Sequence, residues 1–205
     1  MEMFIPFDRP QSLYSSSFFS RCVVCCLFFF SALSQTHSPQ CFFTKKMNRN
    51  RTTILDLSNS KLRGERGATT IINSLSKHDN TLLLRSSGLD LEAVTILAKN
   101  LSSRSSLQFL DLSYNKLKDE GVKELSRNLP ENLKELILNG CEIGDEGCKS
   151  LVSNLSRNCD VSRLSLCGNM ITSQGAIYFA SMIESTNLRR LDLSRNIIER
   201  EGVDA

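Results

Sequence analysis

A repeat of about 27 residues governs most of this chain and strongly limits how it can fold. The stretch 107–133 shows one unit, with leucines spaced as L-x-x-L-x-L-x-x-N-x-L and then an apolar spacing typical of a helix. The residue that closes the motif recurs at intervals of 27, 28, 26, 28 and 27 residues. The sequence therefore predicts a short strand followed by a helix in each repeat. The six closing residues are Leu62, Leu89, Leu117, Ile143, Ile171 and Ile198.

Each unit begins with two leucines separated by one residue. Because side chains alternate along a strand, both leucines are expected to point inward and their neighbours outward. Replacement of an outward neighbour such as Ser113 is then expected to cost little stability. The six pairs are Leu55/Leu57, Leu82/Leu84, Leu110/Leu112, Leu136/Leu138, Leu164/Leu166 and Leu191/Leu193.

A small residue follows the closing position by four residues in five of the units, as the start of the helical half. In the first unit one additional residue separates Leu62 from Gly67, which predicts a longer turn or a bulge there. The acidic pairs Asp119-Glu120 and Asp145-Glu146 stand just before these small residues. Carboxylates suit the positive end of a helix, so the two pairs are interpreted as caps and not as catalytic groups. The small residues are Ala93, Gly121, Gly147, Gly175 and Gly202.

The residue two positions before the closing one varies between units. It is asparagine at 115, 169 and 196, but Ser60, Ser87 and Cys141 in the other three. An asparagine side chain both donates and accepts hydrogen bonds, whereas serine or cysteine replaces it only in part. The first two turns are therefore expected to be the looser ones.

On these motifs, residues 52–205 resemble the leucine-rich repeats of the ribonuclease-inhibitor type, found also in nucleotide-binding immune receptors and in activators of the Ran GTPase. The resemblance implies an α/β solenoid, a horseshoe fragment of about six repeats with parallel strands on the concave face and helices on the convex face. It also implies a non-catalytic scaffold or recognition module that binds a protein partner. Two alternatives stay open: a regulator of an enzyme, either a nuclease inhibitor or a small-GTPase activator, and a secreted or cell-surface recognition protein.

Residues 1–46 lack the repeat pattern, so the repeat domain is placed at 47–205, with its last repeat incomplete. The apolar run Cys22–Leu33 is too short to span a bilayer as a helix. Three interpretations remain: a disordered or spurious segment with Met47 as the true start, a signal peptide, or a membrane anchor. The first is favoured, which predicts a cytoplasmic protein without a membrane contact. A signal peptide at residues 1–34 would make the protein secreted instead.

Composition and isolated motifs argue against several other classes of function. A net charge of +3, without a clustered basic stripe, gives no reason to expect nucleic-acid binding. Cys22-x-x-Cys25 has no second cysteine pair at zinc-like spacing, so no metal site is expected, and no motif points to a cofactor or to catalysis. The four cysteines of the repeats are interpreted as buried free thiols, which favours a reducing compartment. They are Cys141, Cys148, Cys159 and Cys167.

The outward strand positions define the expected binding face. Phe109 and Tyr114 are predicted as its anchors, flanked by Arg163 and Arg190, because aromatic and arginine side chains most often dominate interface energies. Neither end of the array shows a polar cap, so self-association through the C-terminal end, or membership of a longer array, is also expected. The predicted partner-binding residues are Phe109, Tyr114, Asp111, Arg85, Leu83, Glu135, Ile137, Arg163, Arg190 and Arg195.

Overall fold

The computed structural model describes residues 44–47, 53–158 and 160–199. The chain divides into two units, Met1–Gln40 and Cys41–Ala205, and all the described residues belong to the second. Most of the predicted N-terminal segment therefore lies outside the described residues. So do Cys159 and the helix start expected at Gly202.

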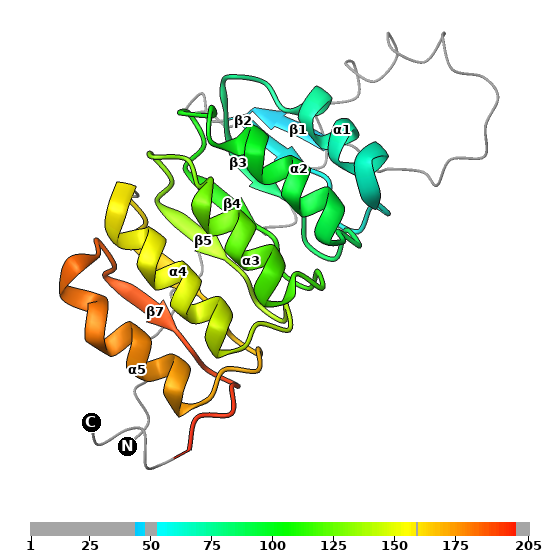
Figure 1. Cartoon of the computed structure of the whole chain (residues 1–205). Coiled ribbons are helices and arrows are strands. Elements are labelled where there is room, and N and C mark those ends of the chain that lie inside the picture. Colours follow the sequence, from blue (N-terminus) through cyan, green and yellow to red (C-terminus); the bar gives the residue numbers. More distant parts are fainter. Residues whose placement is uncertain (1–43, 48–52, 159, 200–205) are drawn as a thin grey trace, which may run out of the picture. The chain divides into compact units, whose positions relative to one another are not determined.

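In the second unit, strands and helices alternate and stack side by side in chain order (Figure 1). We number the repeats 1 to 6, beginning with β2 and α1. A short 3-10 helix, η2 (Ile183–Ser185), follows the last described α-helix. The strands are β1 (Thr44–Met47), β2 (Thr53–Asp56), β3 (Asp79–Leu83), β4 (Phe109–Asp111), β5 (Glu135–Ile137), β6 (Arg163–Ser165) and β7 (Arg190–Asp192). The α-helices are α1 (Gly64–Ser74), α2 (Leu91–Leu101), α3 (Lys118–Arg127), α4 (Asp145–Asn158) and α5 (Ser173–Met182).

The strands form one sheet in the order β1 to β7. β2 to β7 are parallel and pair equivalent residues of successive repeats, which confirms the predicted α/β solenoid. β1 was not predicted: it pairs antiparallel with β2, with Thr44 opposite Asp56. Its sequence, TKKM, has no repeat pattern from which pairing could be inferred. β1 supplies hydrogen-bond partners for an edge of β2 that would otherwise be open.

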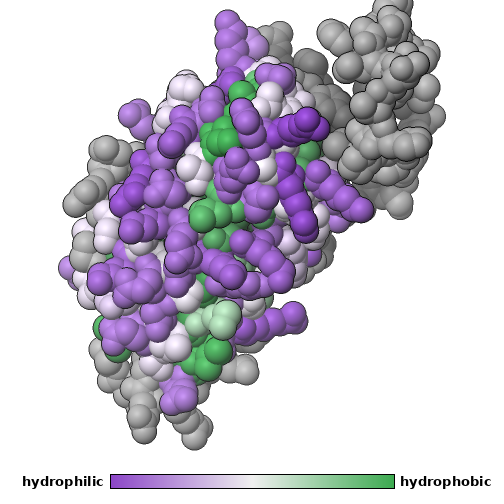
Figure 2. Space-filling model, turned by 45° about the vertical axis from the view of Figure 1, so that its right-hand side comes forward, coloured by the Kyte–Doolittle hydropathy of each residue, from purple (hydrophilic) through white to green (hydrophobic). Residues whose placement is uncertain are grey.

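The inward leucines form the core, as the alternating pattern predicts. Both leucines of each strand pair from repeat 1 to repeat 5 are fully buried, and the helices contribute apolar side chains to the same cluster. In repeat 6, Leu191 and Leu193 are only half-buried. On the face turned to the viewer in Figure 2, hydrophobic surface forms only a narrow, broken band between hydrophilic side chains. Most of the leucine content is therefore inside.

In the acidic pairs interpreted as helix caps, the aspartates Asp119 and Asp145 accept hydrogen bonds at the start of the helix in the following repeat. Asp119 Oδ1 of repeat 3 accepts hydrogen bonds from the backbone N–H groups of Gly144 (2.7 Å) and Gly147 (3.1 Å) at the start of α4. Asp145 of repeat 4 accepts from the N–H (2.9 Å) and the hydroxyl (2.6 Å) of Thr172, just before α5. A carboxylate at this place satisfies free N–H groups and complements the helix dipole.

The glycines at the helix starts leave room for these carboxylates. A Cβ atom added at Gly147 would lie 2.6 Å from Asp119 Oδ1, and one added at Gly175 would lie 2.5 Å from Asp145 Oδ1. In repeat 1, α1 begins two residues after Leu62, the same offset as in repeats 2, 4 and 5, so the predicted longer turn does not precede it and the additional residue lies within α1. There Gly64 has a φ of +59°, and its N–H donates to the carboxylate of Asp90 at 3.0 Å.

The asparagine position joins successive repeats. Asn115 Nδ2 donates to the carbonyls of Leu84 and Leu112, both at 2.8 Å, and its Oδ1 accepts from the N–H of Leu89 at 3.0 Å. Ser87 donates to the carbonyl of Leu57 at 2.8 Å, but the N–H of Leu62 bonds to the backbone carbonyl of Ser87 instead of its side chain. Serine therefore replaces asparagine only in part, as predicted.

Ser60 occupies the same position in repeat 1, and no repeat described by the structure precedes it. Its hydroxyl oxygen is buried and has no hydrogen-bond partner among the described residues. Its equivalent in repeat 2 donates to a carbonyl of the repeat before it. The first turn is therefore the least satisfied of the six.

Candidate protein-binding surface on the open sheet face

The helices cover one face of the sheet, and the outward strand residues lie on the other, which we call the open sheet face. The strand register aligns its side chains in rows that cross the repeats. The first row contains Ile54, Thr81, Phe109, Glu135, Arg163 and Arg190, and the second contains Asp56, Leu83, Asp111, Ile137, Ser165 and Asp192.

The two predicted anchors belong to repeat 3 but lie at opposite ends of its strand segment. Phe109 is half-buried at the start of β4, whereas Tyr114 follows the strand and is 52% exposed. With a rise of about 3.3 Å per residue, five residues separate their backbones by roughly 15 Å. The anchors are therefore two separate contact points and not one aromatic cluster.

Tyr114 is held in place by residues of both neighbouring repeats. The guanidinium carbon of Arg85 lies 4.5 Å from the centroid of its ring. A Cβ atom added at Gly140 would come within 2.9 Å of the ring, so the ring lies against the backbone there. The cation and the close backbone fix the orientation of an exposed aromatic side chain. Arg85 and Tyr114 were each predicted as binding residues, but their stacking was not.

Tyr114 also has a left-handed backbone, with a φ of +59°. This turn position has a positive φ in all six repeats, and glycine holds it only in repeats 4 and 5. Non-glycine residues in this conformation cost roughly 1–2 kcal/mol. Tyr114 and Arg195 are the two bulky residues among the six. The six residues are Asn59, Ser86, Tyr114, Gly140, Gly168 and Arg195.

The apolar residues of the second row flank an aspartate. Leu83 and Ile137 are half-buried and lie on the two sides of Asp111. Asp111 Oδ1 accepts a hydrogen bond from the N–H of Ser113 at 2.8 Å, and Asp56 and Asp192 make the same bond two residues ahead. The carboxylate thus stabilises its own turn. Leu83 and Ile137 are left as the residues of this row that suit a partner.

The charged residues lie towards repeats 4 to 6. Glu135, Arg163 and Arg190 are neighbours in the first row, and Arg163 Nη1 lies 3.5 Å from Glu135 Oε2. Burial raises the pKa of Glu135, and the charge of Arg163 opposes this effect. Arg195 is exposed in the turn after β7. Arg163 is therefore balanced locally, whereas Arg190 and Arg195 have no salt bridge within the described part of the chain.

A polar network surrounds Ser165, which lies between Ile137 and Asp192 in the second row, and it was not predicted from the sequence. The side-chain oxygen of Asn139 accepts hydrogen bonds from the hydroxyl of Ser165 at 2.7 Å and from the N–H of Cys167 at 2.9 Å. Ser165 is 2% exposed, although it points outward. Its small side chain lies between larger neighbours, which the alternating pattern alone does not reveal.

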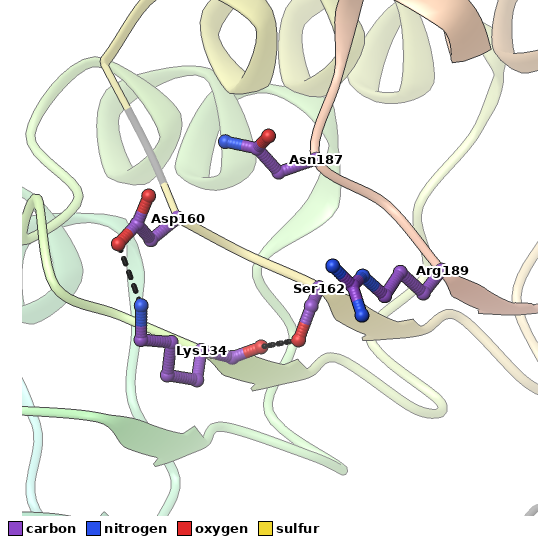
Figure 3. Close-up of a pocket in the computed structure, with 5 residues that line it drawn as sticks. All are labelled: Lys134, Asp160, Ser162, Asn187 and Arg189. Atoms are coloured by element: carbon purple, nitrogen blue, oxygen red, sulfur yellow. Dashed lines mark hydrogen bonds and ion pairs between the residues drawn. The ribbon is translucent and has the colours of Figure 1, made fainter.

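A pocket of about 330 Å³, also missed, lies where β5, β6 and β7 begin (Figure 3). Ser162 lies between Lys134 and Arg189, and Lys134 Nζ pairs with Asp160 Oδ2 at 2.5 Å. The signal that could have revealed it is the run of polar residues directly before the strands. The lining residues are Lys134, Asp160, Ser162, Asn187 and Arg189.

The thiols of the repeats differ in their environment. Cys141 and Cys148 are fully buried, as the interpretation as small apolar residues predicts, whereas Cys167 is only partly buried. Burial raises the pKa of Cys141 and of Cys148 to about 12, from 9.0 for an ordinary thiol. Only the thiolate is nucleophilic, so both buried thiols should be unreactive near neutral pH.

We expect iodoacetamide at about pH 8 to modify Cys167 in the folded protein and to spare Cys141 and Cys148. Peptide mass spectrometry before and after denaturation measures this difference. Because the folded pKa lies above 9.0, the two buried thiols stabilise the fold fully below pH 9, and this contribution is lost as the pH rises towards 12. Equal alkylation of all three cysteines in the folded state would contradict the assignment.

The described residues offer neither a metal site nor a membrane-spanning helix. No group of three or more His, Cys, Asp or Glu side chains there has an arrangement that could hold a metal ion. None of the helices in that part of the chain is both long and apolar enough to cross a bilayer.

Comparison with known proteins identifies the repeats. The sequence matches the family described as Leucine Rich repeat at residues 104–126, 130–152 and 184–205. These matches fall on repeats 3, 4 and 6, and they cover both predicted anchors and Arg195. No curated protein matches the chain.

Proposed function

Because this chain is a leucine-rich repeat protein, a class whose stacked repeats serve as protein–protein interaction modules, we propose that it binds a protein partner on the open sheet face. From the resemblance to leucine-rich repeats, this face is expected to be the concave one. The observation that carries the proposal is Tyr114, an exposed aromatic residue on a left-handed backbone, stacked on Arg85. Strain of this kind at an exposed, preorganised side chain suggests a functional site.

The other contacts follow from the register of the strands. Phe109 lies in the first row, while Leu83 and Ile137 present apolar surface in the second. Apolar and aromatic side chains of this kind form the centre of many interfaces, surrounded by a polar rim. We propose that the protein acts by binding and not by catalysis, because Asp119 and Asp145 are occupied as helix caps.

A Phe109→Ala/Tyr114→Ala variant tests the proposal. It is expected to lose at least about 2 kcal/mol of binding free energy, roughly a 30-fold loss of affinity, towards a partner captured by the wild type and then purified. Titration calorimetry measures the affinity, and circular dichroism melts verify the fold. The matched control is Leu91→Ala/Ile177→Ala, which removes exposed apolar side chains from the helices. A partner that binds both variants like the wild type would contradict docking on the open sheet face.

A second proposal is self-association through the last repeats. Met170 and Ile197 occupy the same position in repeats 5 and 6, and both are 56% exposed. Repeats 1 to 4 have Lys61, Gly88, Lys116 and Glu142 there. Half-buried Leu191 and Leu193 lie in the same part of the unit. This exposed apolar surface favours contact with a second copy.

We expect sedimentation velocity of the full chain to show a concentration-dependent dimer. A Met170→Lys/Ile197→Lys variant should shift it towards monomer, because two buried charges would oppose the contact. A wild-type monomer at every concentration would contradict self-association and would leave the open sheet face unaffected.

A further inference from the structure

The charge of the open sheet face changes along the repeats. In β2 to β4, its rows contain the carboxylates Asp56 and Asp111, with Arg85 as the cation in the turn after β3. Around β5 to β7, cations outnumber carboxylates. The cations there are Lys134, Arg163, Arg189, Arg190 and Arg195, and the carboxylates are Glu135, Asp160 and Asp192.

The carboxylates of this second half are already engaged. Glu135 pairs with Arg163, and Asp160 pairs with Lys134. Asp192 accepts hydrogen bonds from the N–H of Ser194 at 2.9 Å and from the hydroxyl of Ser165 at 3.3 Å. Within the described residues, this leaves three arginines without a salt bridge: Arg189, Arg190 and Arg195.

Two of the cations are direct neighbours. Arg163 and Arg190 are register partners on adjacent parallel strands, which lie about 4.8 Å apart. Like charges placed opposite each other destabilise a sheet, and Glu135, whose single charge lies near both arginines, forms a salt bridge with Arg163 alone. An added anion would therefore relieve a repulsion that is built into this end of the face.

On the basis of the proposed function, we propose that the partner presents an acidic segment, rich in aspartate or glutamate, which docks across repeats 4 to 6. Arg189 and Arg190 bind carboxylates at the start of β7, and Arg195 binds another beyond its end. Five residues between Arg190 and Arg195 correspond to roughly 15 Å, a distance that an extended peptide spans. The planar guanidinium group binds carboxylates through two parallel hydrogen bonds.

The pocket extends this surface at the strand starts. Arg189 and Ser162 line it, and its volume of about 330 Å³ is large enough for one acidic side chain. The pairing of Asp160 with Lys134 leaves the charge of Arg189 available there. A nucleic acid fits less well, because the exposed aromatic of the face, Tyr114, already stacks on Arg85 and lies in repeat 3.

The test uses the full chain and a fluorescein-labelled glutamate-rich peptide, with the same peptide carrying glutamine as a reference. Fluorescence anisotropy should show that the glutamate peptide binds and that the glutamine peptide does not. The affinity for the glutamate peptide should fall as salt is added. An Arg189→Glu/Arg190→Glu variant is expected to lose at least about tenfold in affinity. The control, Arg66→Glu/Lys123→Glu, changes the net charge equally on exposed residues of α1 and α3 and should stay within about twofold.

Melts of each variant verify the fold, and Arg189→Gln/Arg190→Gln serves as a milder replacement if charge reversal unfolds the protein. No binding by the wild type, or equal losses in test and control variants, would overturn the proposal. Tighter binding of a single-stranded oligonucleotide, lost in the same arginine variant, would also overturn it. A purified partner that loses affinity in Phe109→Ala/Tyr114→Ala but not in Arg189→Glu/Arg190→Glu would refute the acidic segment while leaving the proposed function intact.

Discussion

Replacement of Asn115 with alanine is expected to lower the free energy of unfolding by about 3 kcal/mol or more. The side chain is 1% exposed and joins repeats 2 and 3. Its loss leaves the N–H of Leu89 and the carbonyl of Leu84 buried without their side-chain partner. Each unsatisfied buried group costs roughly 1–3 kcal/mol. Urea denaturation followed by circular dichroism measures the change.

Two further variants test whether the loss of stability comes from the hydrogen bonds between repeats or from the removal of any asparagine side chain. Asn132→Ala removes an exposed side chain with one hydrogen bond, to the carbonyl of Ser105, and should cost about 0.5 kcal/mol or less. Asn115→Ser should give an intermediate loss, because Ser87 keeps the donor but not the acceptor role at this position. Equal unfolding midpoints for Asn115→Ala and Asn132→Ala would show that the asparagine is not needed to join the repeats.

Replacement of Leu112 with alanine is expected to cost about 2–5 kcal/mol through lost burial and the cavity that remains. Leu112 is fully buried in the core of repeat 3, between the equivalent leucines of repeats 2 and 4. The matched control is Leu83→Ala, an outward and only half-buried leucine of the adjacent strand, which should cost clearly less. Thermal melts in which both variants lose equal stability would place the inward and outward faces one residue out of register.

Ser113, the outward neighbour of Leu112, shows where the alternating pattern stops being informative. The sequence predicted that its replacement would cost little. In the structure it is 1% exposed, and its hydroxyl accepts a hydrogen bond from the N–H of Asn139 at 3.3 Å. Outward side chains of short strands can be covered by longer neighbours. Its burial and this hydrogen bond make Ser113 a poor control for Leu112, and Leu83 is the better one.

The fold could be predicted because its determinants recur with the period of the chain. The inward leucines, the asparagine at 115 and the glycine at 147 each have a fixed place in the repeat. β1 could not be predicted, because its TKKM sequence shows no signal for pairing with β2. The extra residue before Gly67 was visible in the sequence as a change of interval, but its place within α1, instead of in a longer turn, was not.

The candidate site could be predicted only as a set of outward positions. Which of them interact depends on distances between repeats that the sequence does not contain. Arg85 stacks on Tyr114, and Glu135 pairs with Arg163, so these four residues form two interacting pairs. Phe109 and Tyr114, predicted together as anchors, lie at opposite ends of one strand segment. Arg190 has no salt bridge within the described residues, and this can be seen only once the partners of Glu135 and Asp192 are known.

The carboxylate caps link successive repeats in both directions: Asp119 and Asp145 act on the following repeat, whereas Asp90 accepts from Gly64 of the repeat before it. The start of α4 depends on Asp119 from the repeat before it, and the turn into α5 depends on Asp145 in the same way. A single repeat is therefore not a self-sufficient module. Excision of repeat 3 would strip α4 of its acceptor, and excision of repeat 5 would remove Asn169, which accepts from the N–H of Ile143 just before α4. Swapping, duplicating or shortening such an array thus removes contacts on both sides of the cut, and a functional boundary between repeats need not coincide with the boundary read from their sequences.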